Sequence, residues 1–147
     1  MALTIRGNNQ VSGTWGQFWW NGHLILEIQT FEAKVIANRE EVSLGMSKDS
    51  KITSLSGEGT FAIKKFFTRG KKEILEAWKR GEDPRATFIA KVQDPDAKGK
   101  QSERISIDNV WFNELLLLQF EKGTPSQEEF SFGFTPEDAS FVDVIAV

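Results

Sequence analysis

The sequence contains no cysteine and no tyrosine, and it has one histidine, His23. Without cysteine, the chain has no disulfide, no thiolate nucleophile and no sulfur-based zinc site, which fits a reducing compartment. A catalytic triad would have to use His23, which directly follows a predicted tight turn. An exposed strand residue is the favoured interpretation of this histidine, so the sequence predicts no enzyme.

Long apolar runs and a strong excess of one charge are also missing. The 147 residues are 39% hydrophobic and 27% charged, and no apolar run approaches the roughly 18 residues that a membrane span needs. The first ten residues lack the pattern of a secretory signal, so we expect a cytoplasmic protein. A net charge of -3 argues against a grip on nucleic acid phosphates. The length favours one domain over residues 1–147.

The charge is unevenly distributed along the chain. Residues 1–70 carry 8 basic and 6 acidic side chains, whereas residues 71–147 carry 10 and 15. Complementary halves could stack head to tail, although ordinary solubilising charge is the favoured interpretation of this feature alone.

The residues that are abundant indicate a mainly β fold. Twelve phenylalanines, five tryptophans and twelve glycines are typical of aromatic side chains on pleated sheets joined by tight turns. Asn21-Gly22 predicts a type I′ turn between strands at residues 16–20 and 23–30. Further strands are predicted around residues 85–93, 104–123 and 128–134. One helix is predicted over about residues 71–80, since Ile74, Leu75 and Trp78 share a face and Gly81 follows.

Two predicted strands each have one polar face. Residues 31–41 and 54–64 alternate polar and apolar side chains with the period of two that a half-buried strand shows. The polar set is Glu32, Lys34, Asn38, Glu40, Ser54, Ser56, Glu58, Thr60 and Lys64. Between these strands, a Ser-, Gly- and Lys-rich stretch predicts a projecting loop at about residues 45–54.

Two apolar groups are candidates for a core or a subunit interface. Trp19 and Trp20 are adjacent and therefore point to opposite faces of a strand, so one can enter the core and the other a neighbour. The four leucines Leu115, Leu116, Leu117 and Leu118 place apolar side chains on both faces, which favours cover on both sides. Sugar stacking on Trp15, Trp19 and Trp20 is a weaker alternative.

Motifs for metal or nucleotide chemistry are weak. Asp94 and Asp96 resemble the start of a calcium loop, but the later acidic ligands are missing and an Asp-Pro turn explains the pair. The Gly-Glu-Gly of residues 57–59 lacks the Gly-Lys-Ser/Thr of a phosphate-binding loop. No cofactor is expected.

The chain resembles the tail tube proteins of contractile phage tails, of the type found in defective prophages and phage-tail-like bacteriocins. The resemblance runs through the segments VSGTWGQFWWNG, FEAKVIANREEV, SGEGTF, KRGEDPRATFIAKVQDPDAKGKQSERISIDNVWFNEL and EEFSFGF. It spans nearly the whole chain, and residues 79–114 are its most specific part.

The resemblance implies a β-sandwich or open β-barrel of tail-tube type with one flanking helix. It implies hexameric rings that stack into a hollow tube inside a sheath, conducting DNA or other cargo. The partners implied are further copies, the sheath protein, the tape-measure protein, the baseplate hub and the tail terminator. The protein would assemble in the bacterial cytoplasm and then belong to the virion or tail-like particle.

Within this picture, the polar set of the two alternating strands is predicted to line the lumen. The predicted loop is the candidate arm to the next ring, with the residues Gly45, Met46, Ser47, Lys48, Asp49, Ser50 and Lys51. The alternatives are a monomeric β-barrel carrier of an apolar ligand and a carbohydrate-binding module.

Overall fold

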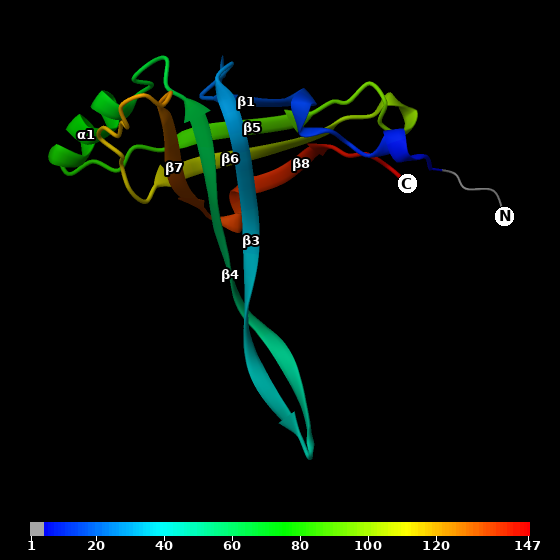
Figure 1. Cartoon of the computed structure of the whole chain (residues 1–147). Coiled ribbons are helices and arrows are strands. Elements are labelled where there is room, and N and C mark those ends of the chain that lie inside the picture. The colour runs from blue at the N-terminus through cyan, green and yellow to red at the C-terminus, as the bar shows by residue number, and fades with distance from the viewer. Residues whose placement is uncertain (1–4) are drawn as a thin grey trace.

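A computed structural model describes residues 5–147 as a β-rich body from which one long hairpin projects (Figure 1). The strands are β1 Gly16–Trp20, β2 His23–Leu24, β3 Ile28–Leu44, β4 Ser47–Lys64, β5 Ala86–Val92, β6 Glu103–Phe112, β7 Gln127–Phe134 and β8 Ala139–Asp143. The one α-helix of the described part is α1 Lys71–Lys79, and short 3-10 turns are η1 Gly7–Asn9, η2 Gly13–Trp15, η3 Lys98–Lys100 and η4 Pro136–Asp138.

The strands form one antiparallel sheet in the order β2-β1-β5-β6-β7-β4-β3, and β8 also pairs with β6. Strand β6 belongs to both halves of the fold, because residues 104–107 pair with β8 whereas Trp111 and Phe112 pair with β7. Between these parts lies Asn109, whose φ of 54° is left-handed, a conformation that asparagine tolerates better than most residues. Figure 1 shows β3, β4 and β7 crossing β1, β5 and β6 at a steep angle, which makes an open sandwich.

Phenylalanine rings fill the space between the two halves. Phe61 stacks on Phe130 with ring centroids 4.8 Å apart, and Phe18 lies 4.9 Å from Phe61. Phe88 meets Phe132 edge to face at 5.0 Å. These rings are at most 1% exposed, and tilted and edge-to-face contacts of this kind stabilise aromatic cores. The predicted class, mainly β with one flanking helix, is confirmed.

Helix α1 covers one end of the sandwich. It buries Ile74 and Ala77, and it begins after Gly70, whose φ of 67° is left-handed. The predicted range of about 71–80 agrees with the observed Lys71–Lys79 to within one residue.

Two predicted elements are wrong. Residues 45–54 are not a loop: Gly45 and Met46 form a tight turn, and β4 begins at Ser47. Their polar side chains suggested a loop, but backbone pairing with β3 satisfies the chain there. The second error concerns residues 113–120, which form no strand. Leu115 and Leu116 are half-buried, while Leu117 and Leu118 are exposed.

Candidate functional site: the projecting hairpin and the surfaces around it

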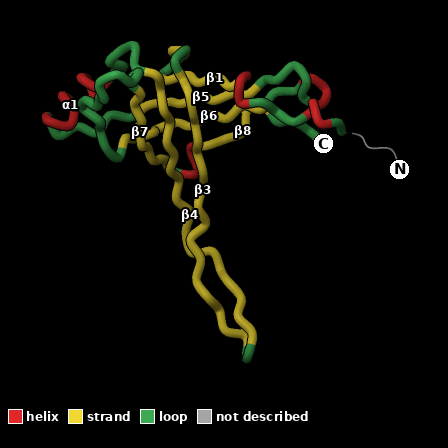
Figure 2. The backbone as a smooth tube through the Cα atoms, viewed as in Figure 1, coloured by secondary structure: helices red, strands yellow, loops and turns green. Residues whose placement is uncertain are grey.

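The β3–β4 hairpin is the most distinctive feature of the molecule, and its far half extends well beyond the body (Figure 2). Strand β4 pairs with β7 only from Gly57 to Lys64. Residues 47–56 of β4 therefore have a free backbone edge among the described residues, and β3 pairs with β4 alone. An exposed edge of this length offers a ready template for pairing with another chain.

The cross-strand register places the predicted polar set on one face of this hairpin. Directly opposite residues share a face, and the pairs are Glu32 with Thr60, Lys34 with Glu58, and Asn38 with Ser54. Ser56, Glu40 and Lys64 follow on the same face by alternation. We call this side the polar face, although it also carries the apolar residues Ile36, Val42 and Leu44.

A β-bulge divides the hairpin into two halves. Asn38 pairs with Ser54, but Arg39 pairs with Ile52, so Thr53 is an extra residue on β4. A bulge shifts the alternation of its strand by one and increases the local twist. Beyond it, the polar face continues through Lys51 and Asp49, which pair with Glu40 and Val42.

Lys51 and Asp49 were predicted to lie in a loop, so their place on the polar face was not predicted. One signal was present in the sequence. Ile52 and Leu55 are both apolar and three residues apart. In a regular strand such residues point to opposite faces, so they can share a face only if a bulge lies between them.

Charges on the polar face compensate one another locally. Lys34 Nζ lies 3.8 Å from a Glu32 oxygen and 3.7 Å from a Glu58 oxygen. All three side chains are more than half exposed, so these pairs contribute little stability. Their effect is to present closely mixed charge rather than a continuous basic track.

The opposite side of the hairpin continues the core. Phe31 and Phe61 are paired there inside the body, and the same face then carries Val35, Leu55 and Ile52. These three aliphatic side chains are about half exposed, because the body ends where Gly57 pairs with Phe134. We call this side the core-side face. Its uncovered part is a contiguous apolar strip of the kind that marks protein–protein contacts.

The residues predicted for a core or interface lie in different places. Trp20 packs against Phe61, Phe112 and Phe130 in the core. Trp19 is half-buried and points to the other side of β1. The four leucines lie in the segment between β6 and β7. Leu115 packs against the same core as Trp20, whereas Leu117 and Leu118 are exposed.

A buried ion cluster fixes the segment of the leucines against the helix. The Glu128 side chain is 1% exposed and accepts hydrogen bonds from Lys65 Nζ, at 3.0 Å, and from Lys71 Nζ. Lys71 Nζ also donates to the Leu117 carbonyl oxygen at 3.0 Å. Burial by itself would raise the pKa of Glu128, but the hydrogen bonds from the two ammonium groups outweigh it and lower that pKa. The carboxylate is therefore held ionised.

A second ion pair joins Glu27 to Arg69, which lies between Lys65 and Lys71 in the sequence. Arg69 donates through Nε and Nη2 to the two oxygens of Glu27, with the Nη2 bond at 2.9 Å. The hydrogen bond from Arg69 lowers the pKa of Glu27. This bidentate geometry fixes the loop before α1 to the segment before β3.

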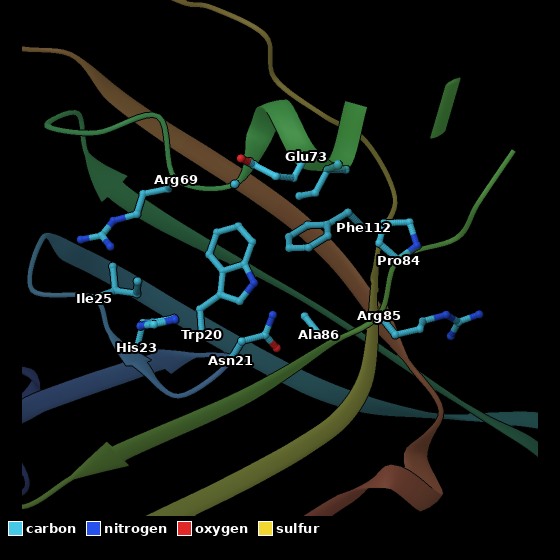
Figure 3. A pocket seen from close by; sticks show the side chains of 12 residues that line it. Trp20, Asn21, His23, Ile25, Arg69, Glu73, Pro84, Arg85, Ala86 and Phe112 are labelled. Atoms are coloured by element: carbon cyan, nitrogen blue, oxygen red, sulfur yellow. The ribbon is translucent and has the colours of Figure 1, made fainter. Parts of the chain in front are cut away.

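A cavity of about 480 Å³ opens between the start of α1, the β1–β2 turn and the segment before β5 (Figure 3). Trp20, Ile74 and Phe112 give it apolar walls, and His23 and Glu73 are among its polar residues. Its lining includes no serine, threonine or cysteine, so His23 has no hydroxyl or thiol partner there.

The other motifs have structural explanations. Asp94 is buried, and its carboxylate oxygens accept from the backbone N–H groups of Ser12 and Asp96, each at 2.9 Å. No group of three or more His, Asp and Glu residues within 5–147 could hold a metal. In Gly57 and Gly59, a Cβ would meet the rings of Phe134 and Phe132, so close packing requires these glycines.

The packing of the sheet and of the tryptophans argues against the carrier and carbohydrate-binding alternatives. The carrier hypothesis requires ligand space inside a closed barrel, whereas the sheet is open and its interior is filled by phenylalanine rings. Trp15 is exposed beside β1 while Trp20 packs in the core, so the tryptophans form no common stacking platform.

Within residues 5–147, no helix has the length and apolar character to cross a bilayer.

The fold of this chain is shared with solved chains of contractile injection systems. The chain matches the cap that terminates the tube of the anti-feeding prophage with a TM-score of 0.72, at 8% identity and 98% and 100% coverage of the two chains. It matches a chain of the PVC sheath–tube complex, from an extracellular contractile injection system, with a TM-score of 0.65, at 9% identity and 91% and 92% coverage. At these identities the likeness establishes the fold.

The sequence itself gives the family. A family model described as phage tail tube protein matches residues 3–143, and the chain belongs to that family. It is 28% identical over 138 residues to the phage-like element PBSX protein XkdM of Bacillus subtilis strain 168, covering 92% of both chains. The uncharacterized protein YqbM of the same strain is similar to the same extent. The predicted resemblance is confirmed: this is a tail tube protein of contractile, phage-like systems.

Proposed function

We propose that copies of this protein join into hexameric rings that stack as a hollow tube and conduct DNA or other cargo inside a contractile sheath. The observation that carries the proposal is strand β3, which spans 17 residues and, among residues 5–147, pairs on one side only. Pairing this edge with a neighbouring copy would satisfy its backbone groups and remove an edge prone to aggregation.

The two faces of the hairpin support the same arrangement. In a closed ring, the polar face would look at water in the lumen, while the core-side face with Val35, Ile52 and Leu55 would be covered by neighbouring copies. Mixed charges without aromatic platforms would let a polyanion slide without sticking. The polar set including Glu32, Lys34 and Glu58 is thus the proposed lining.

The far half of the hairpin, with Gly45 and Met46 at its tip, is the proposed arm to the next ring. This role rests on its reach beyond the body and on its lack of cover by its own chain. The further partners proposed are the sheath protein outside, the tape-measure protein within, and the baseplate hub and tail terminator at the ends. Assembly would take place in the host cytoplasm.

Electron microscopy of the concentrated purified protein tests this function. Rings or tubes are expected from the wild type. A variant in which Asn-Gly replaces residues 40–51 shortens the hairpin and is expected to fold but not to form long tubes. A wild type that remains monomeric at every concentration would overturn the proposal, and long tubes from the shortened variant would refute the role of the arm.

A further inference from the structure

The stretch from the last residue of β4 to the second residue of α1 forms an exposed basic and aromatic surface. Its sequence, KKFFTRGKK at 64–72, contains five cationic residues. Phe66 and Phe67 are 70% and 60% exposed, and the Arg69 guanidinium lies 5.0 Å from the Phe67 ring centroid. Large aromatic side chains with this exposure on a β-rich body point to a contact with another molecule.

The charges of this segment have two different roles. The three inner cations are paired within the chain, Lys65 and Lys71 with Glu128 and Arg69 with Glu27. The two end cations, Lys64 and Lys72, are exposed and take part in no ion pair among the described residues. We call Lys64, Phe66, Phe67 and Lys72 the basic surface. Lys64 is the last residue of β4 and also the last residue of the polar set, so the proposed lining and the proposed docking surface meet there.

A second exposed surface has the opposite charge and the same mixed character. It comprises η4 and the following β8, where Glu137 and Asp138 precede Phe141, which is 67% exposed, and the exposed Val142. Neither acidic residue has an ion-pair partner within residues 5–147. Within the described part of the chain, strand β8 pairs with β6 on one side only. We call Glu137, Asp138, Phe141 and Val142 the acidic surface.

These surfaces lie on opposite sides of the body. In Figure 1 the loop between β4 and α1 is at the top, whereas η4 and β8 are at the lower side, where the hairpin leaves. The tube drawing in Figure 2 shows the same separation. A single chain cannot bring them together, but two copies can.

We propose that the acidic surface of one copy docks on the basic surface of the next copy along the tube. The inference rests on the proposed function, and it adds a defined contact to it. Each surface pairs two unpartnered charges with two exposed apolar side chains, so the charges would set orientation while the apolar groups are removed from water. Because the surfaces differ, the contact is head to tail and repeats without limit, as stacking requires.

The position of the hairpin agrees with this polarity. It leaves the body on the same side as the acidic surface, so both features would reach toward the same neighbouring ring. The acidic surface would make the contact close to the body, and the hairpin tip a contact further away.

Charge reversal tests the docking. The variant Lys64→Glu/Lys72→Glu carries acidic groups on both surfaces, and Glu137→Lys/Asp138→Lys carries basic groups on both. Each is expected to raise the protein concentration needed for tube formation by about tenfold or more, because like charges would meet. The quadruple variant restores opposite charges with exchanged signs, so it is expected to form tubes like the wild type. Sedimentation and electron microscopy measure assembly, and circular dichroism verifies the fold of each variant.

Lys98→Glu/Lys100→Glu is the matched control for the lysine double variant. It changes the net charge by the same amount, but on a turn outside both surfaces. It is expected to assemble like the wild type. Three results would overturn the docking while leaving the tube intact: normal tubes from either double variant, a folded quadruple variant that does not assemble, or an equal defect in the control. A wild type that never self-associates would instead overturn the tube function together with the docking.

Discussion

Asn38 and Ser54 form the last regular pair of the hairpin before its bulge, and Asn38 Nδ2 donates to Ser54 Oγ at 3.0 Å. One step further, Thr53 Oγ1 donates to the Asn38 carbonyl oxygen at 3.1 Å. The side chains of both strands thus hold the bulge in place. This position separates the half of the hairpin near the body from the half that projects, so the bulge sets the direction of the tip.

Removing Thr53 is predicted to abolish assembly without unfolding the body. The deletion leaves every pair beyond Asn38 with the same partner, so both faces keep their side chains and only the local twist and bend change. The tip would then point elsewhere. Electron microscopy should show a folded protein that forms no long tubes.

Thr53→Ala is the matched control for this deletion. It removes the hydrogen bond to the Asn38 carbonyl but keeps the extra residue, at a cost of at most about 1 kcal/mol at this exposed site. Tubes are expected from this variant. Normal tubes from the deletion would show that the bulge does not direct the tip.

Arginine on the polar face is predicted to impede cargo. Replacing Ser56 and Thr60 together by arginine would make the proposed lining more basic, and phosphate groups would then bind where they should slide. Ser54 is left unchanged, because its side chain bonds to Asn38 at the bulge. Rings and tubes are expected to form, while DNA delivery by assembled particles should slow or stop. The same positions changed to glutamine add bulk without charge and should impair delivery less. Unchanged delivery by the arginine variant would contradict the lumen assignment.

Gly59→Ala is predicted to destabilise the body. A Cβ at this position would lie 2.3 Å from the Glu32 carbonyl oxygen and 2.5 Å from Phe132 Cζ. Overpacking of this kind typically costs about 1–3 kcal/mol. Gly7→Ala is the control, because nothing lies within 4 Å of a Cβ there. Urea denaturation should give a lower midpoint for the first variant only, and equal midpoints would show that the strands can shift to make room.

Local chemistry made some of this fold predictable. Asn21-Gly22 set the first turn, with φ of 49° and 82°, and the periodicity around Ile74 gave the helix. The polar faces of β3 and β4 were also predicted correctly, because the alternation of polar and apolar residues is visible within the sequence of each strand alone. These features depend on residues close together in sequence.

Features that depend on contacts between residues distant in sequence could not be predicted from the sequence. Residues 47–52 look like a loop, and only their partners on β3 make them a strand. Leu115 to Leu118 look like a strand, but Lys71, 46 positions before Leu117, holds this segment through its carbonyl oxygen. The pairing of Glu128 with Lys65 and Lys71 spans 63 and 57 positions. No local pattern specifies contacts of this separation.

The Glu128 cluster leads to a prediction for stability against pH. The pKa of Glu128 lies below its usual value of 4.5 in the folded protein, so the ionised form contributes stability above that value and the contribution is lost as the pH falls through the folded pKa. Glu128→Gln leaves Lys71 buried without its counter-charge and is expected to cost about 3–5 kcal/mol at neutral pH. The difference from the wild type should begin to shrink below pH 4.5, where the Glu128 carboxyl of the unfolded chain becomes protonated while that of the folded chain is still ionised. Thermal melts of unassembled protein measure it, with the exposed Glu103→Gln as a control that changes little. A difference that stays constant down to pH 3 would mean that the packing of Glu128, rather than its charge, stabilises the helix end.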